Sequence, residues 1–402
     1  MTLDQWEVLL GRWSSPRADA SQVAQRHTES ETVSQVEFDV TPAPERESVT
    51  PSVDSQPTRP RAAEPAAAEP AAAFAAGAST PWLDSIEQPA MACEFEVLLN
   101  HAQYSQGIER ARDALRVVHS LEDQLSVYRP RSDFSNVNRW GHERAVGVGY
   151  DVCRLLAVAQ DVSRETGRAF DITAGALSEV WGFSRRQGRK PADLELAEAL
   201  KLVDSSLVTI DKSALTVRLS RAGVKLNPGG IGKGYALDCV ANALVDTKVE
   251  DFLIHGGRSS VAARGDRLAS SAGGGWWIAL AHPLRWEEKL GRVRLRNRAL
   301  GTSGAGKQFF HYQGVRYSHV IDPRTGWPAQ GVLSASAICR SGALSDALAT
   351  AFMVMGPEQT RAFCATRPEL GAILVSTEPG SSRLVIDRIN IADEDWQGER
   401  EL

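Results

Sequence analysis

The sequence predicts an α+β fold, with mixed sheets and helices packed against them. Helical and strand periodicities are both present from about residue 85 onward. They do not follow the regular βαβ order of a doubly wound parallel sheet, and strand patterns dominate the second half of the chain. The composition changes sharply near residue 80. This change separates a globular part, which we place at 85–390, from an N-terminal segment of a different kind.

The first helix of the globular part is predicted at 108–128, where Ile108, Ala111, Leu115 and Val118 recur every three or four residues. The other expected helices cover 152–165, the stretch after Pro191 to residue 202, 231–245, 345–355 and 357–365. The expected strands cover 94–99, 207–210, 215–219, 252–255, 276–280, 293–295, 316–321, 332–338 and, as the final strand, 372–376.

The N-terminal segment has two parts. Residues 20–80 are rich in Ala, Pro, Glu, Ser and Thr, and they contain too little apolar surface to offset the entropy of ordering, so we predict a disordered linker. Residues 1–19 include Trp6, Leu9, Leu10 and Trp13 at a spacing that suits a short amphipathic helix for docking. An unstructured end with chance apolar residues accounts for the same pattern.

The composition also excludes several classes of protein. The formal net charge of -5 and the absence of a basic arm interleaved with aromatics argue against a nucleic-acid partner. The five cysteines are scattered without a C-x-x-C pair, which favours reduced thiols over disulfides or a zinc site. The sequence contains no apolar run of the roughly 18 residues that a transmembrane helix needs, and no secretory signal pattern, so we expect a cytoplasmic protein.

A glycine-rich loop at 226–236 is the first candidate for ligand binding. Gly229, Gly230, Gly232 and Gly234 surround the start of a predicted helix, where backbone amides and the helix dipole favour a phosphate. The spacing fits neither a Walker loop nor a dinucleotide-binding fingerprint. A purely structural turn between strand and helix explains the loop equally well.

A pair of oxygen-bearing side chains on one predicted helix is the second candidate. Asp346 and Thr350 are four residues apart and therefore share a face. A carboxylate and a hydroxyl suit a Mg²⁺ ion that also binds substrate phosphates and water. The alternative is an Asp that interacts with the helix dipole and a Thr that bonds to its own backbone.

Two further segments gather polar and aromatic groups. At 316–326 a strand leads into a turn, and His319 lies there with Asp322 and Arg324 nearby in sequence. A lone histidine at the end of a strand is usually a structural residue, but the polar neighbours favour a functional one here. A histidine titrates near neutral pH and can take a proton from an attacking hydroxyl. Residues 167–183 combine Phe170, Asp171 and further aromatics that could enclose a planar heterocycle or could simply pack in the core.

In their order along the chain, these segments resemble the ApbE family of FAD:protein FMN transferases. The resemblance covers about 90–380, essentially everything after the linker. The matching blocks lie at 91–97, 125–128, 170–183, 229–236, 255–257, 301–304, 316–326 and 345–350. Several of these blocks are specific, and their shared order makes chance agreement very improbable.

The resemblance implies a T-fold-like architecture with a central cleft for a flavin nucleotide. FAD, the substrate, would lie near Met91, Tyr128, Ala169, Phe170, Asp171, Asn227 and Lys233. Mg²⁺ would be held by the side chains of Asp346 and Thr350 and the carbonyl of Gly230. His319 would act as general base while a Ser or Thr hydroxyl of an acceptor flavoprotein attacks the FMN-side phosphorus and AMP leaves.

The chain also departs from the family pattern. Asn227 stands where the family usually has Asp, Arg258 where an acid is common, Ala305 where an Asp is usual, and Cys93 where Thr is frequent. These departures leave open weaker FAD binding, a different acceptor motif, or a flavin-binding or storage protein without efficient transfer. A pyrophosphatase that splits FAD into FMN and AMP is a further alternative, because it would use the same metal site. Intact Asp346, Thr350 and His319 favour catalysis over storage, because binding alone needs no aligned base.

Overall fold

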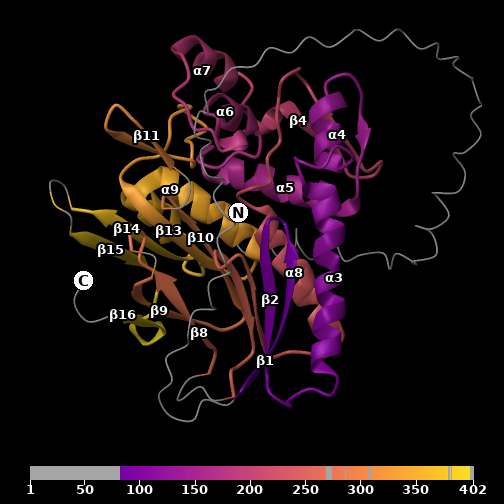
Figure 1. Ribbon diagram of the computed structural model, residues 1–402, viewed down its shortest axis with the longest axis vertical. Coiled ribbons are helices and arrows are strands. Elements are labelled where there is room, and N and C mark those ends of the chain that lie inside the picture. The colour runs from indigo at the N-terminus through magenta and orange to yellow at the C-terminus, as the bar shows by residue number, and fades with distance from the viewer. Residues whose placement is uncertain are drawn as a thin grey trace, which may run out of the picture. The chain divides into compact units, whose positions relative to one another are not determined.

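The computed structural model describes residues 82–268, 274–285, 287–306, 309–378, 381 and 383–398 (Figure 1). The predicted docking helix at 1–19 and the predicted linker at 20–80 lie outside the described residues and stay predictions. The predicted globular region at 85–390 lies almost wholly within them.

An eight-stranded sheet forms the centre of the described region, and all neighbouring strands in it are antiparallel. Its order is β1-β2-β6-β7-β10-β13-β14-β15. The strands are β1 (Leu83–Ala90), β2 (Cys93–Asn100), β6 (Phe252–Gly256), β7 (Ser260–Arg264), β10 (Arg298–Gly304), β13 (Val332–Cys339), β14 (Gly371–Thr377) and β15 (Leu384–Ile389).

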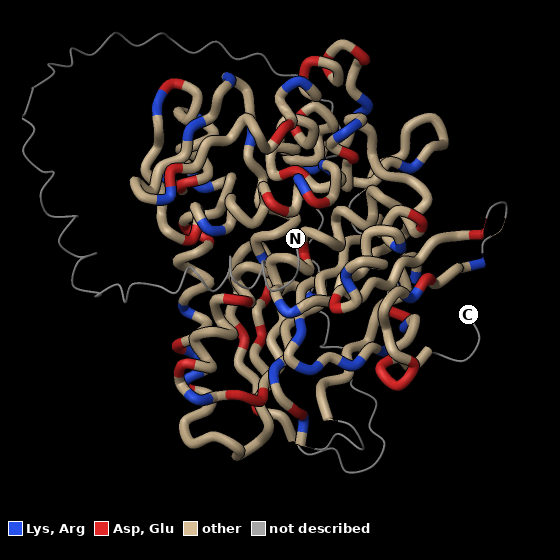
Figure 2. Tube along the Cα trace, turned by 180° about the vertical axis from the view of Figure 1, so that it is seen from behind, with Lys and Arg blue, Asp and Glu red and all other residues tan. Residues whose placement is uncertain are grey.

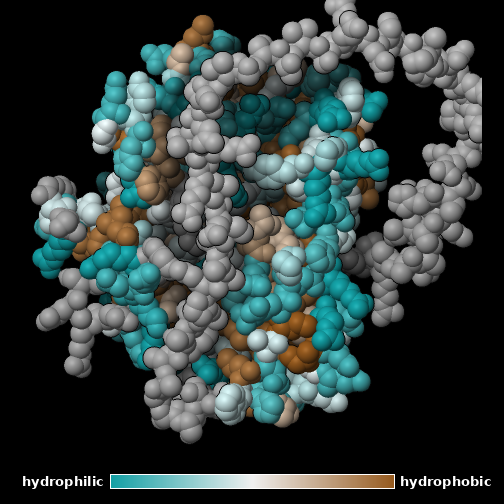
Figure 3. Space-filling model, in the orientation of Figure 1, coloured by the Kyte–Doolittle hydropathy of each residue, from teal (hydrophilic) through white to brown (hydrophobic). Residues whose placement is uncertain are grey.

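Three helices cover one face of this sheet: α3 (Gly107–Leu125), α8 (Gly232–Asp246) and α9 (Gly342–Ala365) (Figure 1). In α3 the buried residues Ala111, Leu115, Val118 and Leu121 recur every three or four positions, as the sequence predicted. The opposite side of α3 is exposed and hydrophilic (Figure 3).

Helices α8 and α9 cross at a pair of glycines. A Cβ atom added to Gly234 would lie 1.9 Å from the carbonyl oxygen of Gly342, and one added to Gly342 would lie 2.4 Å from the carbonyl oxygen of Gly234. Only residues without a side chain allow this approach, so the crossing requires glycine on both helices.

Each of these two helices also supplies a carboxylate to the N-terminal end of the other. Asp238 of α8 accepts hydrogen bonds from Ser341 Oγ at 2.7 Å and from the backbone N–H groups of Gly342 at 2.6 Å and Ala343 at 3.0 Å. In return, Asp346 of α9 accepts a bond of 2.7 Å from the N–H of Gly234. Both carboxylates therefore satisfy helix N–H groups that have no partner within their own helix.

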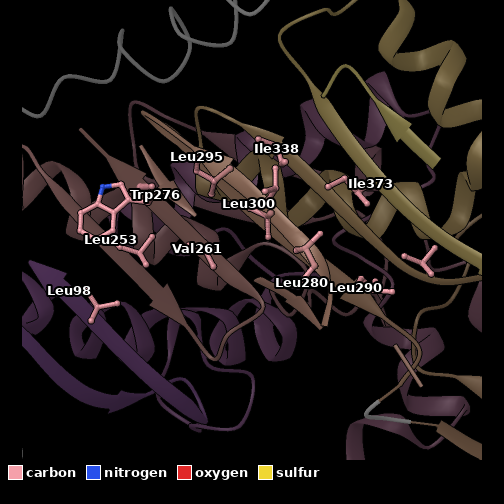
Figure 4. Close-up of a cluster of buried hydrophobic side chains, with 13 residues drawn as sticks. Leu98, Leu253, Val261, Trp276, Leu280, Leu290, Leu295, Leu300, Ile338 and Ile373 are labelled. Carbon is pink, nitrogen blue, oxygen red and sulfur yellow. The ribbon is translucent and has the colours of Figure 1, made fainter. Parts of the chain in front are cut away.

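A smaller sheet, β16-β9-β8, covers part of the opposite face of the central sheet. Its strands are β8 (Trp276–Ala281), β9 (Lys289–Leu295) and β16 (Trp396–Gly398). Between the two sheets lies an apolar core that includes Trp276, Leu280, Leu295, Leu300 and Ile338 (Figure 4). Apolar burial on both sides thus fixes the central sheet between helices and a second sheet.

The remaining elements form the part of the molecule drawn at the top of Figure 1. They are α4 (Asp133–Trp140), α5 (Tyr150–Glu165), α6 (Gly175–Val180), α7 (Asp193–Leu200), the short helices η1 (Phe183–Arg185) and η2 (Ser205–Leu207), the sheet of β3 (Val146–Gly147), β5 (Thr216–Leu219) and β4 (Val208–Asp211), and the hairpin of β11 (Phe309–Tyr312) and β12 (Val315–Ser318). A third short helix, η3 (Asp393–Asp395), precedes β16.

The predicted α+β class is confirmed, and most predicted elements lie where periodicity placed them. The strand at 372–376 is not the final one, because β15 and β16 follow it. The strand predicted at 316–321 already ends at Ser318. The helices predicted at 345–355 and 357–365 form one span that is interrupted at Gly356, whose φ of 72° is non-helical. The edge strand β1 escaped prediction because its charged residues and Pro89 weaken the strand pattern.

Charged residues of both signs are interspersed over the described chain, as the view from behind shows (Figure 2). None of the described helices combines the length and the apolar character that a bilayer-spanning segment requires.

The glycine crossing gives a direct stability prediction. Gly234→Ala places a methyl group against the Gly342 carbonyl, so α8 and α9 must separate, and we expect a loss of about 3 kcal/mol in the free energy of unfolding. Gly147→Ala is the matched control, since a Cβ there meets no atom within 4 Å. Denaturant unfolding measures both variants, and equal stabilities would show that the crossing tolerates a side chain.

Candidate functional site

The glycine-rich loop lies directly against α9. A Cβ atom added to Gly230 would lie 3.0 Å from Thr350 Oγ1 and 3.2 Å from Cε2 of Phe170. The Thr350 hydroxyl also lies 2.9 Å from the hydroxyl of Ser303 on β10, and it donates to the Asp346 carbonyl at 3.3 Å. Gly230, Thr350 and Phe170, which the sequence proposed from three separate segments, are therefore close together.

The Asp346 carboxylate is buried beside this group, with 7% of the residue exposed. Its Oδ2 atom accepts hydrogen bonds from the Gly234 N–H at 2.7 Å and from Ser260 Oγ at 3.0 Å. Burial raises the pKa of the Asp346 carboxyl, while the positive charge of nearby Lys233 lowers it. The structure thus combines a desolvated carboxylate with an adjacent cation.

The segment that contains Ala169 and Phe170 runs beside the strand-like stretch leading into the glycine loop. The N–H of Asn227 donates to the Ile172 carbonyl at 2.8 Å, and the N–H of Gly175 donates to the Lys225 carbonyl at 3.2 Å. Ala169 and Phe170 are buried. Two backbone hydrogen bonds thus fix the predicted flavin-binding residues Phe170 and Asn227 relative to each other.

Asp171, predicted to contact the cofactor, is engaged within the protein. Its Oδ1 accepts from the N–H of Thr173 at 2.9 Å and from the Thr173 hydroxyl at 2.5 Å. Its Oδ2 accepts from Ser163 Oγ at 3.1 Å and from the N–H of Ser205 at 2.9 Å. Asp171 is 5% exposed, so this carboxylate connects its own loop to α5 and η2. In this structure its role is to position the loop that carries Phe170.

Lys233 lies in the first turn of α8, and its charge lowers the pKa of both the Asp346 carboxyl and the Cys93 thiol, although burial raises each of them more. Cys93 follows the tight turn of the β1–β2 hairpin, in which Met91 has a positive φ of 51°. Met91 lies two residues before Cys93, whose thiol interacts electrostatically with Lys233 at the start of α8. Tyr128 differs from the other predicted contacts because its side chain is 77% exposed.

His319 follows β12 and belongs to an aromatic cluster. Its ring is perpendicular to that of Phe183 at a centroid distance of 6.5 Å. Phe183 in turn contacts Phe310 at 5.7 Å, and Phe310 stacks on Tyr317 at 5.4 Å. Trp181 anchors the cluster, since its Nε1–H donates to the Gly326 carbonyl at 2.8 Å.

Strand β10 connects the His319 hairpin with the Asp346 region. Ser303 near its end bonds to Thr350, and the carbonyl of Ala305 just beyond it accepts a hydrogen bond of 2.8 Å from Arg316 of β12. Ser260, Ser303 and Asp238 were not predicted as site residues. Only Ser303 had a signal, because it lies in the block at 301–304.

The residues around Asp346 fit a small hard cation in chemical type. The described residues contain no group of three His, Cys, Asp or Glu side chains suited to a metal, so any ion held here needs hydroxyl, carbonyl or substrate oxygens as well. One carboxylate, the Thr350 hydroxyl and the neighbouring Gly230 backbone supply that kind of donor. The second carboxylate oxygen of Asp346 has no hydrogen bond from the described residues, whereas Oδ2 has two.

Comparison with known proteins decides the family. The ApbE family matches residues 91–374, which is well over half of the chain. The chain belongs to the ApbE family.

Relatives in this family carry one consistent name. A protein from Vibrio cholerae serotype O1, named FAD:protein FMN transferase, is 29% identical over 269 residues, which cover 66% of this chain and 79% of the relative. A Treponema pallidum protein with the same name is 30% identical over 304 residues, 71% of this chain and 84% of the relative. The crystal structure of the ApbE protein from Thermotoga maritima superposes with a TM-score of 0.67 at 27% identity and covers 77% of this chain and 97% of that one. The family and the enzyme class predicted from the sequence are confirmed.

Within the ApbE fold, the departures at Asn227 and Arg258 have distinct consequences. The Asn227 amide oxygen accepts a 2.9 Å bond from the Gly229 N–H, a turn that a carboxylate oxygen would also form, so the exchange from Asp removes a charge and keeps the turn. Arg258 has a positive φ of 62° directly after Gly257, a conformation that Asp and Asn adopt more readily than Arg.

A substitution at Asp171 separates its positioning role from a direct role in binding. Asp171→Asn puts an amide N–H₂ against the Ser205 N–H, so we expect a loss of about 1–3 kcal/mol in the free energy of unfolding without any ligand present. Asp211→Asn is the matched control, because Asp211 also accepts several hydrogen bonds in a turn but is exposed. If thermal unfolding shows wild-type stability for Asp171→Asn, the positioning role is wrong.

Proposed function

We propose that this chain transfers the FMN part of FAD to a Ser or Thr hydroxyl of an acceptor protein in a Mg²⁺-dependent reaction that releases AMP. The observation that carries the proposal is the convergence of Asp346, Thr350 and Gly230 where the start of α8 meets α9, in a family whose relatives are named FAD:protein FMN transferases.

The proposed metal ligands are the free carboxylate oxygen of Asp346, the Thr350 hydroxyl and the Gly230 carbonyl. When bound, Mg²⁺ would neutralise charge on the FAD pyrophosphate. The protein contributes the placement: Gly234 N–H and Ser260 hold Oδ2 of Asp346 in place, and Ser303 orients the Thr350 hydroxyl. Lys233 adds a second positive charge beside the same carboxylate.

The proposed transfer forms one bond and breaks one. The acceptor oxygen bonds to the FMN-side phosphorus, and the bond from that phosphorus to the bridging oxygen breaks, so AMP leaves with the electron pair. The proton of the acceptor hydroxyl passes to His319, which we propose as general base. The aromatic cluster limits the rotation of this imidazole, because Phe183 contacts His319 and is itself connected to Trp181 through Phe310.

Removal of the proposed metal ligand tests the metal assignment without relying on turnover. In wild type, Mg²⁺ at about 100 times its Kd should raise the stability by about 2.7 kcal/mol, seen as a higher Tm. Asp346→Asn should abolish this Mg²⁺-dependent increase and also abolish gel-stable flavin fluorescence on an acceptor flavoprotein. Asp238→Asn is the control, because it weakens the cap of α9 and should lower the Tm while retaining the response to Mg²⁺.

Replacement of His319 tests the base assignment. His319→Asn should reduce FMN transfer about 10²–10⁴-fold while the Mg²⁺-dependent increase in Tm remains. His311→Asn, on the hairpin that precedes His319, is the matched control. Because His311 is exposed, this variant should transfer FMN at the wild-type rate. If wild type instead releases free FMN and AMP and labels no acceptor, the protein is a pyrophosphatase. If it binds flavin and forms neither product, it is a storage protein.

A further inference from the structure

An exposed aromatic surface extends from the cluster that holds His319. We call it the aromatic ledge and define it by four residues: Lys190, Tyr312, Val315 and Trp327. Tyr312, Val315 and Trp327 are 41%, 44% and 38% exposed, respectively. The Lys190 Nζ atom lies 5.8 Å from the ring centroid of Tyr312 and 5.7 Å from that of Trp327. Both aromatic rings therefore form a cation–π contact with the same Lys190 ammonium group.

The ledge forms because the β11–β12 hairpin extends beyond the aromatic cluster on which it packs. Strands β11 and β12 pair Phe310 with Tyr317 and Tyr312 with Val315, and these pairs share one face of the hairpin because side chains alternate. Phe310 and Tyr317 pack on Trp181 at 6.2 and 5.4 Å. The next pair, Tyr312 and Val315, continues past this contact and stays exposed.

The ledge is continuous with the proposed catalytic base. Trp327 packs edge-on against Trp181 at 5.4 Å, and Phe310 connects Trp181 to Phe183, which contacts His319. Val315 precedes His319 by four residues, and four residues of extended chain span about 13 Å. A polypeptide lying along the hairpin from the ledge would thus reach His319 within about four of its own residues.

The segment that leads to Lys190 of the ledge is positively charged. Residues 185–190 include Arg185, Arg186, Arg189 and Lys190 and no acidic residue, although the whole chain has a net charge of -5. Among the described residues, only Arg189 of these four forms an ion pair, with Glu195. This local excess of positive charge favours an acidic ligand.

The backbone of the hairpin also suits an extended ligand. In the described part of the chain, β11 and β12 form a sheet with each other alone. Each strand therefore keeps one edge at which an extended segment can add main-chain hydrogen bonds.

We propose that the aromatic ledge is the docking surface for the acceptor protein, and that it binds an extended acceptor segment. This segment carries an apolar and an acidic side chain about four residues from the hydroxyl that receives FMN. The apolar side chain packs on Tyr312, Val315 and Trp327, and the acidic one pairs with Lys190. The proposal rests on the proposed function, since it assumes that a protein hydroxyl reaches His319. A nucleic acid is the less favoured ligand, because the whole chain has a net charge of -5 and acidic and basic residues are interspersed over its described part (Figure 2).

Binding of synthetic peptides to the full chain tests the proposal. The first probe is a fluorescein-labelled 15-residue peptide with a central Thr and with a Phe and an Asp about four residues away on each side. The second probe has Lys in place of each Asp. Fluorescence anisotropy should show that wild type binds the acidic peptide more tightly, and Lys190→Glu should reduce that affinity about five-fold or more. Tyr312→Ala should also weaken binding.

Matched controls keep the result specific to the ledge. Lys248→Glu changes an exposed lysine near the end of α8 opposite the glycine loop, and Trp82→Ala removes an aromatic residue that is 82% exposed; neither should alter peptide affinity. Equal affinity for the two peptides, or an unchanged affinity in Lys190→Glu, would overturn the proposal. Tighter binding of a 15-nucleotide single-stranded DNA would overturn it in favour of a nucleic acid, and a wild-type dimer that Lys190→Glu dissociates would assign the ledge to a second copy of this chain.

The same variants distinguish this proposal from the proposed function. With an acceptor flavoprotein, Lys190→Glu should raise the KM for acceptor and leave kcat and the KM for FAD unchanged. Failure of wild type to label any acceptor would refute the transferase proposal, whereas normal labelling with an unchanged KM for acceptor in Lys190→Glu would refute the docking surface alone.

Discussion

The crossing of α8 and α9 is the contact on which the rest of the site depends. Gly234 and Gly342 let the two helices approach until a Cβ on either would collide with the other backbone. At this distance Asp238 of α8 reaches the N–H groups at the start of α9, and Asp346 of α9 reaches the N–H of Gly234. Each helix thus supplies a carboxylate to the start of the other. The carboxylate takes the place of water as hydrogen-bond partner of N–H groups that the fold has buried.

The same crossing determines where the site chemistry lies. It brings the glycine loop, which begins α8, against Thr350, one turn after Asp346 on α9. It also buries Asp346, and that burial raises the pKa of its carboxyl. A desolvated carboxylate is costly to keep ionised, and the divalent cation that we propose to bind here would offset that cost. The stability of the fold and the proposed metal site therefore depend on one pair of helices, and a side chain at Gly234 would disturb both.

A second group of residues supports the site from further away. Asp171 connects the loop that carries Phe170 to α5 and η2, and Trp181 packs against the β11–β12 hairpin that precedes His319. The side chains of Asp171 and Trp181 form hydrogen bonds with other parts of the protein. The contact between Ser303 and Thr350 and the bond from Arg316 to Ala305 join this group to the α8–α9 crossing. These residues therefore position the proposed site, and the proposed ligand contacts come from other residues.

The sequence by itself determined the α+β class, most helices and strands, and the segments that carry Gly230, His319, Asp346 and Thr350. Periodicity and glycine spacing are local properties, so one chain suffices to recognise them. Only the tertiary structure decided that Asp238 and Asp346 each accept hydrogen bonds at the start of the other's helix. It also decided that Ser260 bonds to the Asp346 carboxylate and Ser303 to the Thr350 hydroxyl. The Asp171 carboxylate, finally, accepts its hydrogen bonds from within the protein. These contacts join residues that are far apart in sequence: 112 positions separate Gly234 from Asp346. Such pairings follow from how sheets and helices pack, which no local pattern encodes.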